Sequence, residues 1–176
     1  MKEGNNVTTA TFVTCDLLDD HPDVEFQVLT PSIDGKFFRS YGAVTRFAGQ
    51  IVTVKCFEDN SRVKELLATD GRGKVLVVDG GASMRCALMG DMIAESAVKN
   101  HWNGVVIYGC VRDVDALAQL PLGVHALASI PCKSNRKGLG ETEVSLYFGG
   151  VAFHSGHYIY ADNNGIIVAK EKLIED

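Results

Sequence analysis

Two kinds of hydrophobic pattern predict the strands in the first two thirds of the chain. Residues 50–56 alternate and are rich in β-branched side chains, which is typical of a strand. Residues 74–79 and 104–108 are continuous apolar runs, as expected for central strands that are buried on both faces. Residues 87–89 and 124–130 suggest two further strands. These segments together predict a sheet with a buried centre.

Helices are expected between these strands. Residues 60–68 are predicted to form a helix, with Asn60 and Ser61 able to cap its start. Gly90 and Asp91 open a second helix that reaches about residue 100. The stripe of this helix expected to face inward consists of Met92, Ile93, Ala97 and Val98. A short third helix over residues 113–120 is closed by a proline.

The rest of the chain is richer in turns and short strands. Residues 30–46 are predicted to form a long surface loop, and residues 131–141 a polar, glycine-rich one. Four short strands are expected after it, at residues 144–148, 151–153, 158–161 and 166–168. The last two flank Asn163-Asn164-Gly165, a strong hairpin-turn signal. Alternating strands and helices followed by a β-rich end predict a mixed α/β sandwich, with residues 1–176 in a single domain.

The composition narrows the classes of function. The chain has 176 residues, of which 46% are hydrophobic, enough for a sizeable core. Its formal net charge of −5 argues against a nucleic-acid or membrane-surface binder. No apolar run approaches the roughly 20 residues that span a bilayer, and Met1 to Asn6 lack the apolar segment of a secretory signal.

The five cysteines are scattered and form no CxxC pair, so neither a zinc knuckle nor a dithiol redox site is supported. An odd number of cysteines in mostly apolar contexts fits a reducing, cytoplasmic compartment.

The candidate chemistry lies in Asp91 and, after twenty intervening residues, Arg112 and Asp113. Each half sits where a glycine-bearing turn meets a regular element, at the end of a predicted strand. Ligands of open α/β sheets bind at that edge, and a helix start attracts anions. A guanidinium and two carboxylates at this edge would suit a small oxo-acid held against a divalent metal.

From the pattern alone, simpler interpretations stay open. Asp91 and Asp113 can each be an ordinary helix cap, and Arg112 a surface arginine in a salt bridge. Other candidates are weaker. His154 and His157 lack a third metal ligand, and Gly80-Gly81-Ala82-Ser83 is better explained as a turn than as an anion cradle.

Four stretches carry a resemblance to a known family, and it extends from about residue 11 to residue 173. They are residues 49–60, 71–81, 148–151 and 160–167. The chain closely resembles the regulator of ribonuclease activity A family, also described as 4-hydroxy-4-methyl-2-oxoglutarate aldolase-like proteins. This resemblance implies a mixed α/β sandwich of the swivelling β/β/α type, assembled as a ring-shaped homotrimer.

Two functional branches share this fold. One comprises class II aldolases that cleave 4-hydroxy-4-methyl-2-oxoglutarate to pyruvate and decarboxylate oxaloacetate, with the motif Asp-X20-Arg-Asp. The chain carries this motif as Asp91, Arg112 and Asp113. The other branch binds and inhibits a ribonuclease and lacks the second motif aspartate. The resemblance therefore favours a lyase, with a non-catalytic regulator of a ribonuclease or RNA helicase as the alternative.

The resemblance also implies a role for each motif residue. The backbone amides of residues 90–93 (Gly90, Asp91, Met92 and Ile93) would face the substrate carboxylate, and Arg112 would bind the pyruvyl oxygens. Asp113 would hold Mg²⁺ or Mn²⁺, and Asp91 would orient a water for proton transfer. Both reactions pass through a pyruvate enolate, which a divalent cation and a fixed arginine stabilise.

Chain length separates the two expected activities. The chain ends at Asp176 and resembles the shorter family members, so oxaloacetate decarboxylation is favoured over efficient cleavage of the six-carbon substrate. A methyltransferase of menaquinone synthesis, an older label for such proteins, is discounted because no methyl-donor glycine motif is visible.

Overall fold

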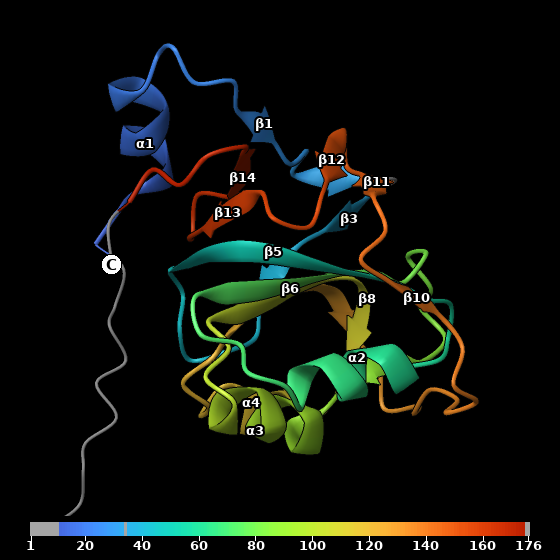
Figure 1. Cartoon of the computed structure of the whole chain (residues 1–176). Helices are drawn as coiled ribbons and strands as arrows, with labels where there is room; N and C mark the ends of the chain where they lie inside the picture. Colours follow the sequence, from blue (N-terminus) through green and yellow to red (C-terminus); the bar gives the residue numbers. More distant parts are fainter. Residues whose placement is uncertain (1–10, 34, 175–176) are drawn as a thin grey trace, which may run out of the picture.

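A ten-stranded mixed sheet lies at the centre of the computed structural model, which describes residues 11–33 and 35–174 (Figure 1). The helices are α1 (Thr14–Asp20), α2 (Ser61–Leu67), α3 (Asp91–Lys99) and α4 (Val114–Leu117). The strands are β1 (Gln27–Val28), β2 (Ser32–Ile33), β3 (Lys36–Phe37), β4 (Arg39–Ser40), β5 (Phe47–Lys55), β6 (Lys74–Asp79), β7 (Ala87–Met89), β8 (Gly104–Val111), β9 (Gly123–Ser129), β10 (Glu141–Thr142), β11 (Leu146–Phe148), β12 (Val151–Phe153), β13 (Tyr158–Ala161) and β14 (Ile166–Ala169). The sheet order is β1-β14-β13-β5-β6-β8-β9-β4, with β10 added to β5 and β7 to β8.

The four central strands β5, β6, β8 and β9 are parallel to one another. Their apolar runs are continuous because both faces are covered. Leu76 and Val78 of β6 pack in the core on one face, and Val75 and Val77 pack in the core on the other. The predicted strand at residues 74–79 is confirmed at both ends, while β8 continues three residues past its predicted end.

Different layers cover the two faces of the sheet. Helices α2, α3 and α4 lie against one face, and the hairpins β2–β3 and β11–β12 lie on the other (Figure 1). On the hairpin side, stacked rings extend the core: Phe148 lies 4.6 Å from Tyr108 and 4.5 Å from Phe153 between ring centroids. The predicted mixed α/β sandwich is therefore confirmed.

Two short segments of the β-rich regions behave nearly as predicted. The turn after β13 leads directly into β14, and Asp162 N donates to Gly165 O at 3.0 Å. Residues 30–46 form mostly loop, as predicted, but contain the two-residue strands β2, β3 and β4. Strand β4 pairs antiparallel with β9 and forms one edge of the sheet.

The helices bring three corrections. Met92 was expected to face inward, yet it is 75% exposed; the buried stripe of α3 is Ile93, Ala94 and Ala97. A helix turns about 100° per residue, so a stripe centred on these positions leaves Met92 outside it. Helix α4 has only four residues: Asp113, its expected first residue, has a left-handed backbone conformation and stays outside the helix, and residues 118–120 continue as turns.

The third correction concerns α1, a helix that local sequence did not predict. A distant carboxylate secures it: Asp162 accepts hydrogen bonds from the amide and the hydroxyl of Thr14, each at 2.8 Å. These hydrogen bonds, together with one from Asn164 N, outweigh the effect of burial and lower the pKa of Asp162.

All five cysteines are free thiols in the structure. Among the described helices, none is both long and apolar enough to cross a membrane. The expected lack of a signal segment concerns Met1 to Asn6, which lie outside the described residues. The homotrimer and the cytoplasmic location stay predictions.

A buried histidine makes the stability of the fold sensitive to acid. His125 on β9 is 6% exposed, its ring packs edge-on against Phe47, and its Nε2 has no hydrogen-bond partner among the described residues. Burial lowers the pKa of His125 to about 4. The side chain is therefore neutral in the folded protein at pH values where the unfolded chain, with a histidine pKa near 6.5, already takes up a proton.

We predict that His125→Leu flattens the loss of stability between about pH 6.5 and pH 4. The wild-type contribution of His125 is fully present above the unfolded pKa and is lost as the pH falls towards the folded pKa, a change of about 3 kcal/mol at most. Urea unfolding of both proteins at pH 7 and pH 4.5 measures the difference. An equally steep acid dependence in the variant would contradict it.

Candidate active site

The parallel pairing of β7 with β8 brings the two halves of the motif together. Arg112 N, just beyond β8, donates to Met89 O, the last carbonyl of β7, at 2.9 Å. Gly90 follows directly. A Cβ atom added to Gly90 would lie 2.4 Å from Asp113 Oδ2 and 3.0 Å from Arg112 Cγ. Only a residue without a side chain allows this close approach, so the glycine is explained by packing.

Asp113 occupies the N-cap position of α4 but does not cap it. Its backbone is left-handed, with φ 55° and ψ 41°, and its side chain makes no capping hydrogen bond. The carboxylate Oδ2 instead lies 3.3 Å from Arg112 Nε and accepts from Asp91 N at 3.3 Å. The capping interpretation of Asp113 is therefore wrong. Aspartate tolerates this conformation better than most residues, and such strained positions cluster at functional sites.

Asp91 is the first residue of α3, and Gly90 is the N-cap. Asp91 Oδ1 accepts from Met92 N at 2.7 Å. Two of the amides expected to face a ligand thus already donate to carboxylates: Asp91 N to Asp113 and Met92 N to Asp91. The role of the amides of Gly90, Asp91, Met92 and Ile93 in substrate binding stays a prediction.

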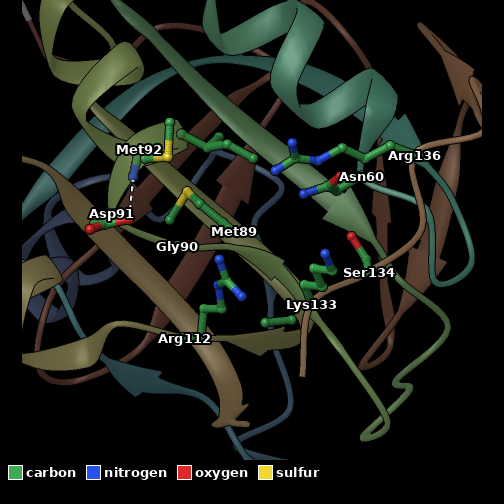
Figure 2. Close-up of a pocket in the computed structure, with 11 residues that line it drawn as sticks. Asn60, Met89, Gly90, Asp91, Met92, Arg112, Lys133, Ser134 and Arg136 are labelled. Atoms are coloured by element: carbon green, nitrogen blue, oxygen red, sulfur yellow. Dashed lines mark hydrogen bonds between the residues drawn. The ribbon is translucent and has the colours of Figure 1, made fainter. Parts of the chain in front are cut away.

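A pocket that is partly open to solvent lies beside these residues (Figure 2). It is lined by Asn60, Ala87, Met89, Gly90, Asp91, Met92, Ile93, Arg112, Lys133, Ser134 and Arg136. Figure 2 shows Arg112 entering from one side, with Lys133, Ser134, Asn60 and Arg136 around the rest of the opening. Three cationic side chains and one carboxylate line the pocket, so it favours anions.

Six of these residues were not identified from the sequence as site residues: the apolar Ala87 and Met89, and the polar Asn60, Lys133, Ser134 and Arg136. Asn60 was interpreted as a helix cap. In the structure its side chain makes no capping bond, and Asp59 Oδ1 accepts from Ser61 N at 2.9 Å instead. The sequence offered one local indication. Three consecutive residues can cap this helix, Asp59, Asn60 and Ser61, so at least one of them is available for another role.

Asp59 also fixes the wall of the pocket. Its Oδ2 accepts from Lys137 N at 2.6 Å, and Ser61 Oγ accepts from Gly138 N at 2.9 Å. Burial alone would raise the pKa of Asp59, but hydrogen bonds from Ser61 and from backbone amides of the loop outweigh it and lower the pKa. The loop of residues 131–140 is therefore tied to the start of α2.

The oxygen donors at the motif fit a hard divalent cation. Asp113 supplies a carboxylate beside the start of α3, where its Oδ2 accepts from Asp91 N, and Asp91 carries a second carboxylate on the same turn. Among the described residues, no three His, Cys, Asp or Glu side chains converge. A cation held by one or two carboxylates keeps several waters, which is the usual situation of Mg²⁺.

The weaker candidates stay weak in the structure. The rings of His154 and His157 lie 5.0 Å apart, and His154 Nδ1 is hydrogen-bonded to Ser145 Oγ, without a further ligand group in the described chain. At the end of β6, Gly81 N donates to Asp79 Oδ1 at 2.9 Å, which makes this segment a turn.

The chain is similar to proteins that carry three different descriptions. An Acinetobacter baylyi protein with the provisional name 4-hydroxy-4-methyl-2-oxoglutarate aldolase is 80% identical over 168 residues, covering 96% of this chain and 99% of that protein. A structure from Geobacillus kaustophilus described as an S-adenosylmethionine:2-dimethylmenaquinone methyltransferase has a TM-score of 0.86 and 44% identity, covering 92% and 97% of the two chains. The structure of the RNA-processing inhibitor RraA from Thermus thermophilus has a TM-score of 0.85 and 39% identity, covering 94% and 96%.

These descriptions differ, but the sequence similarity spans nearly the whole chain in each case. The RraA-like family model, described as Aldolase/RraA, matches residues 14–168, and the chain therefore belongs to the RraA-like family.

Proposed function

We propose that the chain is a divalent-metal-dependent carbon–carbon lyase, a 4-hydroxy-4-methyl-2-oxoglutarate aldolase that also decarboxylates oxaloacetate. One observation carries the proposal: the carboxylate of Asp113 is turned away from its own helix and towards Arg112 and Asp91. A carboxylate kept free of the helix it precedes is available as a metal ligand. The provisional aldolase name of the relative at 80% identity supports the same conclusion.

Arg112 is suited to hold the oxo-acid end of the substrate. Its guanidinium lines the pocket and is about one third exposed, so a ligand can reach it. A guanidinium binds a carboxylate through two parallel hydrogen bonds and adds charge where the enolate develops. A cation held by Asp113 would supply further positive charge at the oxygen of C2.

Asp91 is suited to move the proton. Its Oδ1 is engaged with Met92 N, which fixes the carboxylate, and its Oδ2 makes no hydrogen bond to the described chain. In retro-aldol cleavage, the C4 hydroxyl loses a proton while the C3–C4 bond breaks and its electron pair moves to the enolate. Asp91 Oδ2 can receive that proton, directly or through a water, and C3 is then protonated to give pyruvate.

We predict that Asp113→Asn lowers the turnover of oxaloacetate and of 4-hydroxy-4-methyl-2-oxoglutarate by about 10²-fold or more. Asparagine tolerates the left-handed backbone, and the side chain is partly exposed, so the unfolding temperature should hardly change. Arg112→Ala is expected to have the same effect on turnover. Pyruvate release is measured with Mg²⁺ or Mn²⁺.

Asp115→Asn, on an exposed position of the same helix, is the matched control and should retain wild-type turnover. Wild-type turnover in folded Asp113→Asn would refute the metal-ligand role. Pyruvate release by the wild type no faster than with free Mg²⁺ would refute the lyase.

We further predict that Gly90→Ala lowers kcat/KM by about 10- to 100-fold, because the added methyl group displaces the ends of Asp113 and Arg112, and small misplacements of such groups are costly. Thermal unfolding should change little, since φ of −132° suits alanine and the displaced groups are partly exposed side chains. Gly109→Ala is the matched control, because its methyl group meets neighbours only at 3.4 Å or more. Equal kinetics in the two variants would contradict the prediction.

The alternative function is a non-catalytic regulator of RNA processing. It is supported by the similarity to an RNA-processing inhibitor at 39% identity over nearly the whole chain. Fold does not decide between the two. If the wild type releases no pyruvate above the metal background and instead slows RNA cleavage by a purified ribonuclease, the regulator is the correct assignment.

A further inference from the structure

The pocket wall facing away from the motif contains two buried polar atoms without partners. Asn60 is 5% exposed and Ser134 is 9% exposed, and neither Asn60 Oδ1 nor Ser134 Oγ has a hydrogen-bond partner. Only four such side-chain atoms occur in the described part of the chain, and these two line the same pocket. Buried polar groups are nearly always paired, so two neighbouring exceptions point to a missing ligand.

The backbone around these two residues is held firmly. Asn60 N donates to Asn135 O at 3.2 Å, and Asn135 N donates to Glu58 O at 2.8 Å. On the other side, Ala87 N donates to Cys132 O at 2.8 Å. Ser134 thus lies between two backbone bridges, from Ala87 to Lys133 and from Asp59 to Asn135. The unpaired atoms therefore belong to a preorganised wall.

The charges around them identify the class of ligand. Lys133 and Arg136 line the pocket beside Asn60 and Ser134, and neither forms an ion pair in the described structure. The serine hydroxyl can donate. The buried unpaired atom of Asn60 is its amide oxygen, and a half-turn about χ2 puts the N–H groups of the amide in its place, where they can donate to a carboxylate. Two neutral donors with two cations match a carboxylate.

We propose that Asn60, Ser134, Lys133 and Arg136 form a subsite for a second carboxylate, and that this subsite favours aldol cleavage over decarboxylation. The proposal rests on the lyase function proposed above. Arg112 holds the oxo-acid end of the substrate, and the subsite holds the far end. The preferred substrate is then a 4-hydroxy-2-oxo dicarboxylate.

The preference follows from where the charge goes. In aldol cleavage the C3–C4 bond breaks and the distal carboxylate leaves intact on the second pyruvate, so its charge is unchanged in the transition state. In decarboxylation that same carboxylate gives up its electron pair to the enolate and leaves as neutral CO₂. Groups that stabilise a carboxylate therefore stabilise the ground state of decarboxylation more than its transition state, and slow it.

The experiment compares the two reactions in the full-length protein with Mg²⁺. Ser134→Ala and Asn60→Leu should each lower kcat/KM for 4-hydroxy-4-methyl-2-oxoglutarate by about 10- to 100-fold. The ratio of aldol to decarboxylation kcat should fall at least about tenfold, because decarboxylation loses a ground-state contact. Lys137→Ala, on the same loop but outside the pocket lining, should leave the ratio at the wild-type value.

Two further measurements keep the outcomes separate. Each variant should unfold at or above the wild-type temperature, since it removes an unpaired buried atom. By calorimetry, 2-oxoglutarate should bind the variants at least about tenfold more weakly than the wild type, while pyruvate, which has no second carboxylate, should bind all of them equally.

An unchanged ratio and unchanged 2-oxoglutarate binding, in an enzyme that releases pyruvate, would overturn the subsite and leave the lyase function standing. Absence of pyruvate release from the wild type, with 2-oxoglutarate binding that still depends on Ser134, would overturn the lyase function and retain the carboxylate subsite.

Discussion

The hydrogen bond from Arg112 N to Met89 O is the contact on which the candidate site depends. It is the last step of the parallel pairing between β7 and β8, and it places the turn at Gly90 directly against Arg112 and Asp113. Two helices begin here from neighbouring strands, so the chain must turn sharply twice within a few ångströms. The first turn is possible because Gly90 has no side chain, and the second because the backbone of Asp113 is left-handed. The position of each carboxylate is thus set by backbone constraints.

A second constraint acts on the other wall of the pocket. The buried carboxylate of Asp59 accepts hydrogen bonds from two backbone amides, that of Ser61 at the start of α2 and that of Lys137 in the loop. Asn60 is consequently released from capping, and its buried side-chain oxygen has no hydrogen-bond partner in the described structure. Most of the chain obeys the usual rules of capping, burial and pairing. Exceptions also occur elsewhere, as at His125, but those at Asn60, Ser134 and Asp113 lie in or beside one pocket, where a functional explanation is available.

The sequence was sufficient for the parts of the site that depend on local pattern. Continuous apolar runs located the central strands, and because parallel strands end at the same edge, Asp91 could be expected to meet Arg112 and Asp113. What failed depended on distant contacts. The loop around Ser134 reaches Asn60 across more than seventy residues of sequence, and α1 depends on Asp162, 148 residues from Thr14. No periodicity encodes such pairings. Met92 was misplaced for a different reason, since an apolar residue at a helix start can line a ligand pocket as well as a core.

The charge distribution separates the two functions associated with this family. The chain is acidic overall, with a formal net charge of −5, yet the pocket gathers three cations around one carboxylate. At physiological salt, screening limits the range over which charges act through solvent to roughly 8 Å. A small anion in the pocket therefore interacts mainly with the nearby cations Arg112, Lys133 and Arg136. A protein partner would instead contact the outer surface of the molecule. Evolution can therefore change one function without the other, and similarity of the whole fold cannot decide between them. The proposed lyase function gives a reason for two local features, an Asp113 carboxylate that is free of its helix and an Asn60 side chain that makes no capping bond.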